Sequence, residues 1–382
     1  MTSFSDSIQQ KTDFSVEEIC SLLETTGEGN TASLFSHACR VKNAHARRGV
    51  HFRGIIELSN ICERDCLYCG IRRSNLDVTR FQMTKQQILD AAAWTHKAGY
   101  GSLVIQAGER RDAGFIDFIE EMLREIKKLS GGALGITLSL GEQSKDVYAR
   151  WFEAGAHRYL LRIETSDPEL YRQIHPPGYS FEERVACLGF LRETGYQVGT
   201  GVMIGLPGQT VAQLASDILF FKENDIDMIG MGPYIPHHST PMFQKPLELS
   251  VDSRFKLGLN MIAVTRIVLR DVNIAATTAL QALKSDGREL GLQAGANIIM
   301  PNVTSTEYRT GYQLYDNKPC MDENSEVCRD NLVAGIKNAG ETVIYGQWGD
   351  SKHFCKRKGI ESSHDSATVS QLSGHARRLE QC

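Results

Sequence analysis

The chain has 382 residues, of which 41% are hydrophobic and 23% are charged, and its formal net charge is −4. This composition is typical of a soluble globular protein with one large domain or two smaller ones. The near-neutral charge, without a large Lys/Arg cluster, argues against a nucleic-acid-binding protein. No run of roughly 18 uncharged apolar residues predicts a membrane span. Residues Met1–Asp13 are polar and do not resemble a secretory signal.

The ten cysteines do not indicate a disulfide framework, because the chain is large and carries no export signal. The sequence therefore predicts a reducing compartment, most simply the cytoplasm, and leaves an organelle open.

A helical extension is predicted for the N-terminal region, residues 14–48. Ser15 is a good N-cap, and Ile19, Leu22 and Leu23 follow at helical spacing. A second helix is expected over residues 32–47. We expect this extension to cover one end of the domain that follows.

Three cysteines follow an apolar run, Ile55–Leu58, that has the length of a buried strand. Cys62, Cys66 and Cys69 are spaced C-x3-C-x2-C, so their thiolates can converge on one metal centre. A closed zinc site or an ordinary 4Fe–4S site needs four protein ligands. The next cysteine is Cys187, so we interpret the loop as a catalytic cluster with one open iron. The alternatives are a zinc site completed by a distant residue and three unrelated core cysteines.

From residue 54 onward, strand and helix patterns alternate. Strands are predicted at 54–59, 102–106, 135–139, 158–163, 198–204, 227–231, 273–277 and 296–300. Helices are predicted at 84–98, 115–129, 144–154, 181–194, 210–224, 253–269 and 281–290, with caps at Thr84, Ser180 and Thr210. Eight strands in this alternation predict an α/β fold of the (β/α)8 TIM-barrel type, with working residues at the carboxyl ends of the strands. A six-stranded partial barrel with a different C-terminal part is the alternative.

Charged and glycine-rich segments follow the predicted strands. Arg162 and Glu164 are two residues apart, so they point to the same side of a strand, which we expect to be the lumen. Charged side chains are rarely buried without a partner, so the pair indicates a polar cofactor or substrate. The alternative is a salt bridge that closes the lumen. Gly201 and Gly205 leave room for a ligand, or form a bulge or turn.

Beyond residue 304 the alternation weakens. Tyr308, Tyr312 and Tyr315 indicate a C-terminal segment that folds over an open barrel end. The predicted organisation is an N-terminal helical extension at 1–49, a barrel at 50–345 and a mobile polar tail at 346–382.

Together these segments resemble the radical S-adenosylmethionine (SAM) superfamily, in its biotin synthase-like branch, and within it the HydE family of di-iron hydrogenase maturases. The resemblance covers about residues 15–350. The matching motifs include Glu57-Leu58-Ser59-Asn60, Gln106-x-Gly108-Glu109, Leu138-Ser139-Leu140-Gly141-Glu142, Arg158-Tyr159-Leu160-Leu161-Arg162, Gly205-Leu206-Pro207-Gly208-Gln209-Thr210, Ala276-Thr277-Thr278-Ala279 and Met300-Pro301-Asn302.

The resemblance implies roles for matching positions. Cys62, Cys66 and Cys69 would hold a 4Fe–4S cluster, and Arg162 and Glu164 would be catalytic. An anion or substrate subsite at the other end of the lumen would use Thr277, Thr278 and Ala279. The implied SAM-contacting set is Tyr68, Gly108, Glu109, Ser139, Glu164, Arg184, Met228, Tyr312 and Leu314.

Two positions depart from the family pattern. Ile163 stands where many members have His, which weakens any acid–base role for that position. Some members carry a second cluster on C-x7-C-x2-C near the C-terminus. Here Cys320 and Cys328 match, but Asn331 replaces the third cysteine, so a second site there is weakly supported.

The implied activity is reductive cleavage of SAM to a 5′-deoxyadenosyl radical, which attacks a small substrate in the barrel. The implied substrate is an iron–cysteine complex, and the implied partners are a tyrosine-cleaving maturase and a scaffold GTPase. Two alternatives stay open. One is a biotin synthase-like or methylornithine synthase-like enzyme with a different substrate, and the other is a non-enzymatic iron–sulfur cluster carrier.

Overall fold

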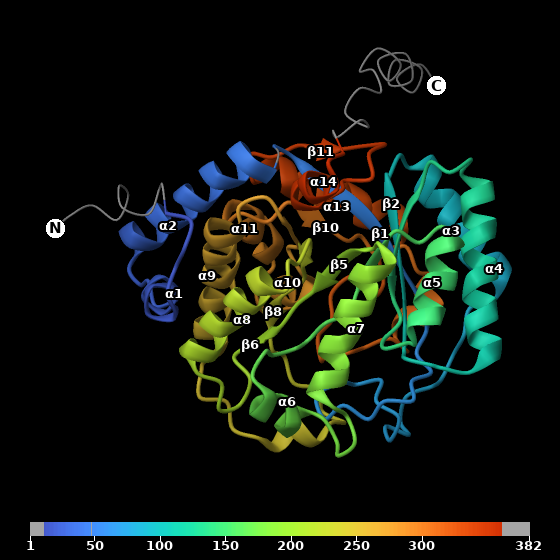
Figure 1. The fold of residues 1–382 in the computed structure, drawn as a ribbon, viewed down its shortest axis with the longest axis horizontal. Helices are drawn as coiled ribbons and strands as arrows, with labels where there is room; N and C mark the ends of the chain where they lie inside the picture. Colours follow the sequence, from blue (N-terminus) through green and yellow to red (C-terminus); the bar gives the residue numbers. More distant parts are fainter. Residues whose placement is uncertain (1–10, 47, 361–382) are drawn as a thin grey trace, which may run out of the picture.

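The computed structural model describes residues 11–46 and 48–360 of the chain. Its centre is a ring of parallel strands surrounded by helices (Figure 1). The strands of the ring are β1 (Val50–Ser59), β2 (Ser102–Ala107), β3 (Gly135–Ser139), β4 (Arg158–Leu160), β5 (Gln197–Thr200), β7 (Met228–Ile229), β9 (Asn273–Ile274) and β10 (Ile298–Ile299).

Hydrogen bonds join these strands in the order β10-β1-β2-β3-β4-β5-β7-β9. A parallel bridge then pairs Ala275, just after β9, with Ile298 of β10, and the Ala276 amide donates to the Ile298 carbonyl at 2.9 Å. β9 therefore returns to β10 and the strands form a ring. This confirms the predicted (β/α)8 fold and excludes the six-stranded alternative.

Five strands end earlier than the sequence pattern predicts. β7, β9 and β10 stop at Ile229, Ile274 and Ile299, against predicted ends at 231, 277 and 300. β4 stops at Leu160 and β5 at Thr200. Glu164 has a φ of +64°, a left-handed conformation that regular strands do not contain. Beyond the ring, β6 (Met203–Ile204) pairs with β8 (Gly232–Pro233) in a separate two-stranded sheet. The segment around Glu164 is therefore a shaped loop above the barrel.

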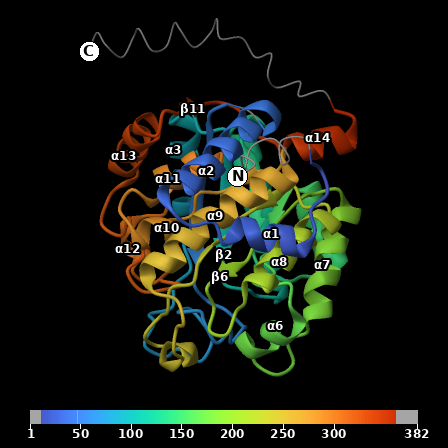
Figure 2. The same ribbon diagram turned by 90° about the vertical axis from the view of Figure 1, so that its left-hand side faces the viewer.

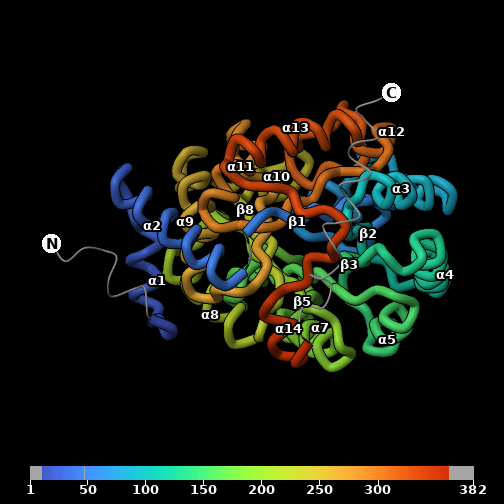
Figure 3. Tube along the Cα trace, turned by 90° about the horizontal axis from the view of Figure 1, so that it is seen from above, coloured from blue at the N-terminus to red at the C-terminus, as the bar shows by residue number. Residues whose placement is uncertain are grey.

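Outer helices surround the strands in the view from above (Figure 3). Six lie at the predicted positions, but the helix predicted at 281–290 is two short helices, Thr278–Leu283 and Gly287–Gln293, and the helix at Pro168–Ile174 was not predicted. Thr84 and Thr210 form complete capping boxes with Gln87 and Gln213, and Ser180 caps its helix through the Glu183 amide, as predicted. The helices are α3 (Lys85–Lys97), α4 (Ala113–Leu129), α5 (Lys145–Glu153), α6 (Pro168–Ile174), α7 (Phe181–Thr194), α8 (Val211–Glu223), α9 (Val251–Leu269), α10 (Thr278–Leu283) and α11 (Gly287–Gln293).

The N-terminal extension is helical but does not cover a barrel end. It consists of α1 (Val16–Leu23), α2 (Glu28–Val41) and a π-helical turn at Lys42–Ala46. α1 packs on α8 and α9, and α2 packs on α9, so the extension is an additional layer on the side of the barrel (Figure 2). Ile19, Leu22 and Leu23 are buried in α1. The expected position was wrong because helical spacing identifies a buried face but not the surface that covers it.

The C-terminal region contacts both ends of the barrel. After α12 (Thr306–Arg309), the segment 310–324 crosses the carboxyl ends of the strands and leads into α13 (Ser325–Asn338). Tyr312 within it is buried, and its hydroxyl accepts a hydrogen bond from Gln106 of β2 at 3.1 Å. The expected closing segment is therefore present.

The first part of the predicted tail packs against the barrel. β11 (Val343–Ile344) pairs with the start of β1, and the Trp348 carbonyl accepts from the Ser102 hydroxyl at 2.8 Å. Asp350 pairs with buried Arg158 at 2.8 Å, and α14 (Lys352–Lys358) follows. Residues 346–360 thus cover the amino end of the barrel, opposite α6 (Figure 1). The polar composition concealed this role because Asp350 is the counter-ion of an arginine far away in the sequence. Residues 361–382, including Cys382, lie outside the described part.

In the part of the chain that the structure describes, every helix is too short or too polar to cross a membrane.

Candidate active site

The cysteine loop lies at the carboxyl end of β1 and is tied to three neighbouring segments. Backbone hydrogen bonds join it to the end of β2, to α6 and to the closing segment. They run from Glu63 N to Glu109 O at 2.8 Å, from Leu67 N to Ile174 O at 3.0 Å and from Gly70 N to Leu314 O at 3.0 Å. The backbone of the loop is therefore fixed independently of any ligand.

The three loop thiols fit a metal cluster by their chemistry. Burial raises the pKa of Cys62 and Cys69 and raises the pKa of Cys66 to about 12. A thiolate in this position needs a compensating positive charge, which a bound iron cluster supplies. The three free thiols match three irons of a 4Fe–4S cluster.

Gly108, at the end of β2, is packed against the cysteine loop. A Cβ atom at this position would lie 2.4 Å from the Ile61 carbonyl oxygen and 2.7 Å from the Cys62 Cβ. Only glycine allows this approach without displacing the loop. The contact gives Gly108 a role in packing the cysteine loop. The family resemblance implied instead that Gly108 contacts SAM.

Arg162 and Glu164 lie on the same side of the chain, as predicted. The Arg162 Nε donates to Glu164 Oε2 at 3.1 Å, and its Nη2 donates to the Val202 carbonyl at 2.9 Å. Burial raises the pKa of Glu164, against the opposing effect of Arg162 and Arg184. Arg162 is one-third exposed and Glu164 only 10% exposed. The pair is therefore a salt bridge at the mouth of the barrel, in which the Glu164 carboxylate is buried.

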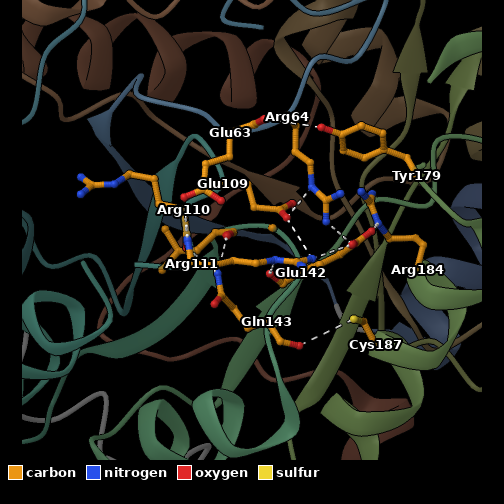
Figure 4. A network of polar contacts seen from close by, with 12 residues as sticks. Glu63, Arg64, Glu109, Arg110, Arg111, Glu142, Gln143, Tyr179, Arg184 and Cys187 are labelled. Atoms are coloured by element: carbon orange, nitrogen blue, oxygen red, sulfur yellow. Dashed lines mark hydrogen bonds and ion pairs between the residues drawn. The ribbon is translucent and has the colours of Figure 1, made fainter. Parts of the chain in front are cut away.

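A cluster of ion pairs connects the cysteine loop to Arg184 (Figure 4). Arg64, between Cys62 and Cys66, pairs with Glu109 at 2.5 Å and also with Glu142. Arg184 donates its Nε to Glu142 at 2.5 Å and its Nη1 to the Arg162 carbonyl at 2.5 Å. Glu142 therefore bridges the cysteine loop and Arg184.

The two acids of this cluster differ in their electrostatic setting. Burial opposes ionisation of Glu142, but Arg184 and Arg64 outweigh it, and its pKa lies below the ordinary value. Burial dominates at Glu109 and raises its pKa, although Arg64 opposes the shift. Glu142 is therefore the principal counter-ion of the cluster.

Comparison with known proteins identifies the family. The Radical SAM superfamily pattern matches residues 56–221. The chain is 43% identical to the FeFe hydrogenase maturase subunit HydE of Thermotoga maritima over 87% of this chain and 92% of that protein. The chain belongs to the HydE family of radical SAM enzymes.

Two further comparisons show more distant similarity, and the second of them shows the fold alone. A biotin synthase of Corynebacterium jeikeium is 27% identical over 76% of this chain and 80% of its own length. The crystal structure of a methylornithine synthase, PylB, superimposes with a TM-score of 0.76 at 24% identity, covering 90% of this chain and 98% of that one. As a radical SAM enzyme of the HydE family, the chain uses a 4Fe–4S cluster and SAM.

The structure gathers most of the predicted SAM-contacting residues at the carboxyl end of the barrel. The Tyr68 hydroxyl lies 3.4 Å from His175 Nε2, and Tyr312 is held by Gln106. Leu314 contacts the cysteine loop through its carbonyl, and Ser139 ends β3 beside Gln106. Glu109 is also at this end, but its carboxylate is occupied by Arg64.

Met228 lies elsewhere. It is the first residue of β7, and its sulfur is 2.9 Å from Arg53 Nη1. In the β1–β2 register, Arg53 lies opposite Ser102, the first residue of β2. The side chains of Arg53 and Met228 therefore lie toward the amino end of the barrel. The structure does not bring Met228 together with the cysteine loop.

Thr277, Thr278 and Ala279 follow β9, at the same end of the barrel as the cysteine loop. The Thr278 and Tyr315 hydroxyls are 2.7 Å apart, which places this segment under the closing segment. The expectation of a subsite at the other end of the lumen was wrong, because all parallel strands direct their carboxyl ends to one side.

Sequence reasoning gave no role to Arg64, Glu142, Glu57 or Lys318. Buried Lys318 pairs with Glu57 of β1 and donates to the Tyr312 carbonyl at 2.8 Å. The sequence offered two signals: Arg64 lies inside the cysteine motif, and Glu109 and Glu142 follow β2 and β3. Their pairing required the barrel, which places the ends of β1, β2 and β3 side by side.

Proposed function

We propose that this chain binds its 4Fe–4S cluster through Cys62, Cys66 and Cys69, with SAM on the remaining iron, and serves the assembly of the FeFe hydrogenase di-iron cofactor. The observation that carries the proposal is the convergence of the cysteine loop with two charged groups at one end of a barrel. These groups are the Arg162–Glu164 pair and Arg184. The 43% identity to a HydE maturase supports the assignment to cofactor assembly.

In this proposal the cluster, when bound, supplies the electron that cleaves SAM to a 5′-deoxyadenosyl radical. Arg184 uses Nε and Nη1 for Glu142 and Arg162, and its other N–H groups would bind the SAM carboxylate. Glu164, with Tyr68, Tyr312 and Leu314, completes the SAM subsite. The buried surroundings exclude water and other hydrogen donors from the radical.

The substrate in this proposal is a small iron–cysteine complex enclosed in the lumen. Arg162 offers a partly exposed guanidinium beside the SAM subsite, suited to a carboxylate or another anion. Thr278, whose hydroxyl lies 2.7 Å from that of Tyr315, would form a second subsite together with its neighbours Thr277 and Ala279. A charged complex could therefore be held between these two groups.

Family membership implies that the chain works with other hydrogenase maturation proteins. We further propose that a tyrosine-cleaving maturase supplies the substrate and that a scaffold GTPase receives the product. The reaction needs a reducing compartment, which agrees with the proposed cytoplasmic location.

The test is an anaerobic assay of the reconstituted chain with dithionite and SAM. Wild type is expected to form 5′-deoxyadenosine, and Cys66→Ala to form less than about a thousandth as much, because the cluster loses a ligand. An absence of product from cluster-loaded wild type, or equal product from the variant, would overturn the proposal.

The same reconstituted protein also distinguishes the alternative functions from the proposed one. A cluster carrier is expected to hold a cluster whose spectrum does not respond to SAM. A biotin synthase-like or methylornithine synthase-like enzyme is expected to cleave SAM without responding to an iron–cysteine complex. The 43% identity to HydE, against 27% to a biotin synthase, favours the maturase.

A further inference from the structure

A second group of metal-ligand side chains lies apart from the cysteine loop. The Sγ atoms of Cys320 and Cys328 and a carboxylate oxygen of Glu323 all lie within 4.8 Å of one another. Cys320 and Glu323 belong to the loop before α13, and Cys328 is in the first turn of that helix. Cys320 and Glu323 are half-buried and Cys328 is buried, so an ion can enter from one side.

The backbone of this loop is held in place by a buried arginine. Arg309 is fully buried, and its Nη1 donates to the carbonyls of Cys320 at 2.7 Å and Glu323 at 2.6 Å. Cys320 itself has a φ of +64°, a conformation that few non-glycine residues adopt. The position of two ligands is thus fixed by the protein before any ion binds.

The third ligand has its own supporting contact. The Asn331 side-chain amide donates to Glu323 Oε1 at 3.1 Å. A residue of this kind beside a ligating carboxylate fixes its orientation, as outer partners do in metal sites. Asn331 occupies the place of the third cysteine in C-x7-C-x2-C, so here that position supports a ligand instead of providing one.

This donor set does not fit an iron–sulfur cluster. Two thiolates and one carboxylate lack the thiolate number that a cluster requires. They do match a tetrahedral divalent ion such as zinc, with water in the fourth position. We propose that Cys320, Glu323 and Cys328 bind one zinc-type divalent cation, with Asn331 as the positioning residue for the carboxylate.

The buried guanidinium of Arg288 near the two thiols favours a metal site with a net negative charge. Two thiolates, one carboxylate and a divalent cation carry a net charge of −1. Arg288 of α11 is 3% exposed, interacts electrostatically with both thiols, and its Nε and Nη1 have no hydrogen-bond partner among the residues described. A buried guanidinium needs a counter-charge, and the proposed centre supplies it. The ion would join the closing segment to α13.

The experiment measures zinc in the tag-free holoenzyme, reconstituted with its active-site cluster, exposed to zinc and desalted. Wild type is expected to retain one zinc per chain, and Cys328→Ser almost none. Glu323→Gln is expected to bind zinc about a hundredfold more weakly, and Asn331→Ala about tenfold, since outer partners contribute 10–100-fold. Cobalt in place of zinc should give a thiolate charge-transfer band in wild type, and Cys328→Ser should lose nearly all of it.

Controls keep the result decisive. Cys20→Ser removes another half-buried thiol, in α1, and should retain zinc. The active-site cluster absorption of each variant reports folding, and Glu323→Gln serves if Cys328→Ser does not fold. The inference is overturned if wild type, Cys328→Ser and Glu323→Gln retain equal zinc, or if wild type retains none. Because SAM cleavage is assayed separately, failure here leaves the proposed function untouched, and the converse also holds.

Discussion

At the scale of single residues, Glu142 has an unusual number of charged partners. One carboxylate contacts Arg64 of the cysteine loop, Arg184 above the lumen and Arg111, the last at 3.0 Å. Glu109 also contacts Arg64, but it forms no ion pair with Arg184. Glu142 therefore ties the position of the proposed SAM-binding arginine to that of the cluster ligands.

We predict that Glu142→Gln raises the KM for SAM about tenfold, because Arg184 loses its charged partner and an amide oxygen in its place accepts only a weaker, neutral hydrogen bond. Iron content should stay at the wild-type level, since the cysteine loop retains Glu109 and its backbone bonds. Arg111→Met is the matched control, because half-exposed Arg111 contacts the same acids but not Arg184. Equal KM values for SAM in wild type and Glu142→Gln would contradict this role.

Asp217 of α8 gives a pH-dependent contribution to stability. It is fully buried, accepts hydrogen bonds from the Ser166 amide and hydroxyl at 2.6 Å, and burial raises its pKa to about 7. Because the folded pKa exceeds the ordinary value of 3.8, the folded chain binds this proton more tightly. The stabilisation is therefore complete below that ordinary value and is lost as the pH rises toward 7.

We expect Asp217→Asn to remove this loss, since an amide oxygen can still accept from Ser166. The difference in Tm, variant minus wild type, should be larger at about pH 8 than at about pH 5. Thermal unfolding of the two proteins across this range measures it. A difference that does not change with pH would show that Asp217 is not protonated in the fold.

Single residues also show what the sequence could supply. The cysteine spacing and the Arg162–Glu164 pair are local patterns, and their place just after predicted strands could be read from the sequence. The partner of Arg64 was not, because Glu142 lies 78 positions away along the chain. Only the parallel alignment of strand ends brings these two charges together.

At the scale of elements, the closing segment is fixed by one buried ion pair. Lys318 is 9% exposed and Glu57 is 3% exposed, and Asn302 donates to the second oxygen of Glu57 at 3.1 Å. The same segment carries Tyr312 and Leu314, which contact β2 and the cysteine loop. The pair therefore holds the predicted SAM-contacting residues over the barrel.

Lys318→Met should lower the free energy of unfolding by about 3 kcal/mol, because Glu57 is left as an uncompensated buried charge. The double variant with Glu57→Gln should recover most of this loss, since neither charge remains. Denaturant unfolding of the apo chain gives both values. Additive losses in the double variant would argue against a direct coupling of the two side chains.

The ends of helices and strands were predictable where a local sequence pattern sets them. They were less predictable where tertiary contacts set them. Capping boxes at Thr84 and Thr210 fixed two helix starts. β4 and β5 were predicted too long, because the turn at Glu164 and the separate β6–β8 sheet leave the apolar pattern unchanged. The position of α1 and α2 depended on the exposed faces of α8 and α9, which no local pattern reports.

At the scale of the whole molecule, the barrel is covered at both ends. Residues 310–324 lie over the carboxyl end, and residues 346–360 cover the amino end through Asp350 and the Trp348 carbonyl. Charged groups lie along this path, from Arg53 of β1 to Arg162 in the loop after β4. This arrangement suits a reaction in which a radical and its substrate stay enclosed.

The central claim is that the three-cysteine cluster leaves one iron for SAM. The most direct measurement is electron–nuclear double resonance on the reduced wild-type cluster with SAM carrying an isotopically labelled amino nitrogen. We predict a coupling between the cluster spin and the label in wild type, and a less intense coupled signal in Glu142→Gln at the same sub-saturating SAM concentration. A reduced cluster that shows no coupling at saturating SAM would contradict the account.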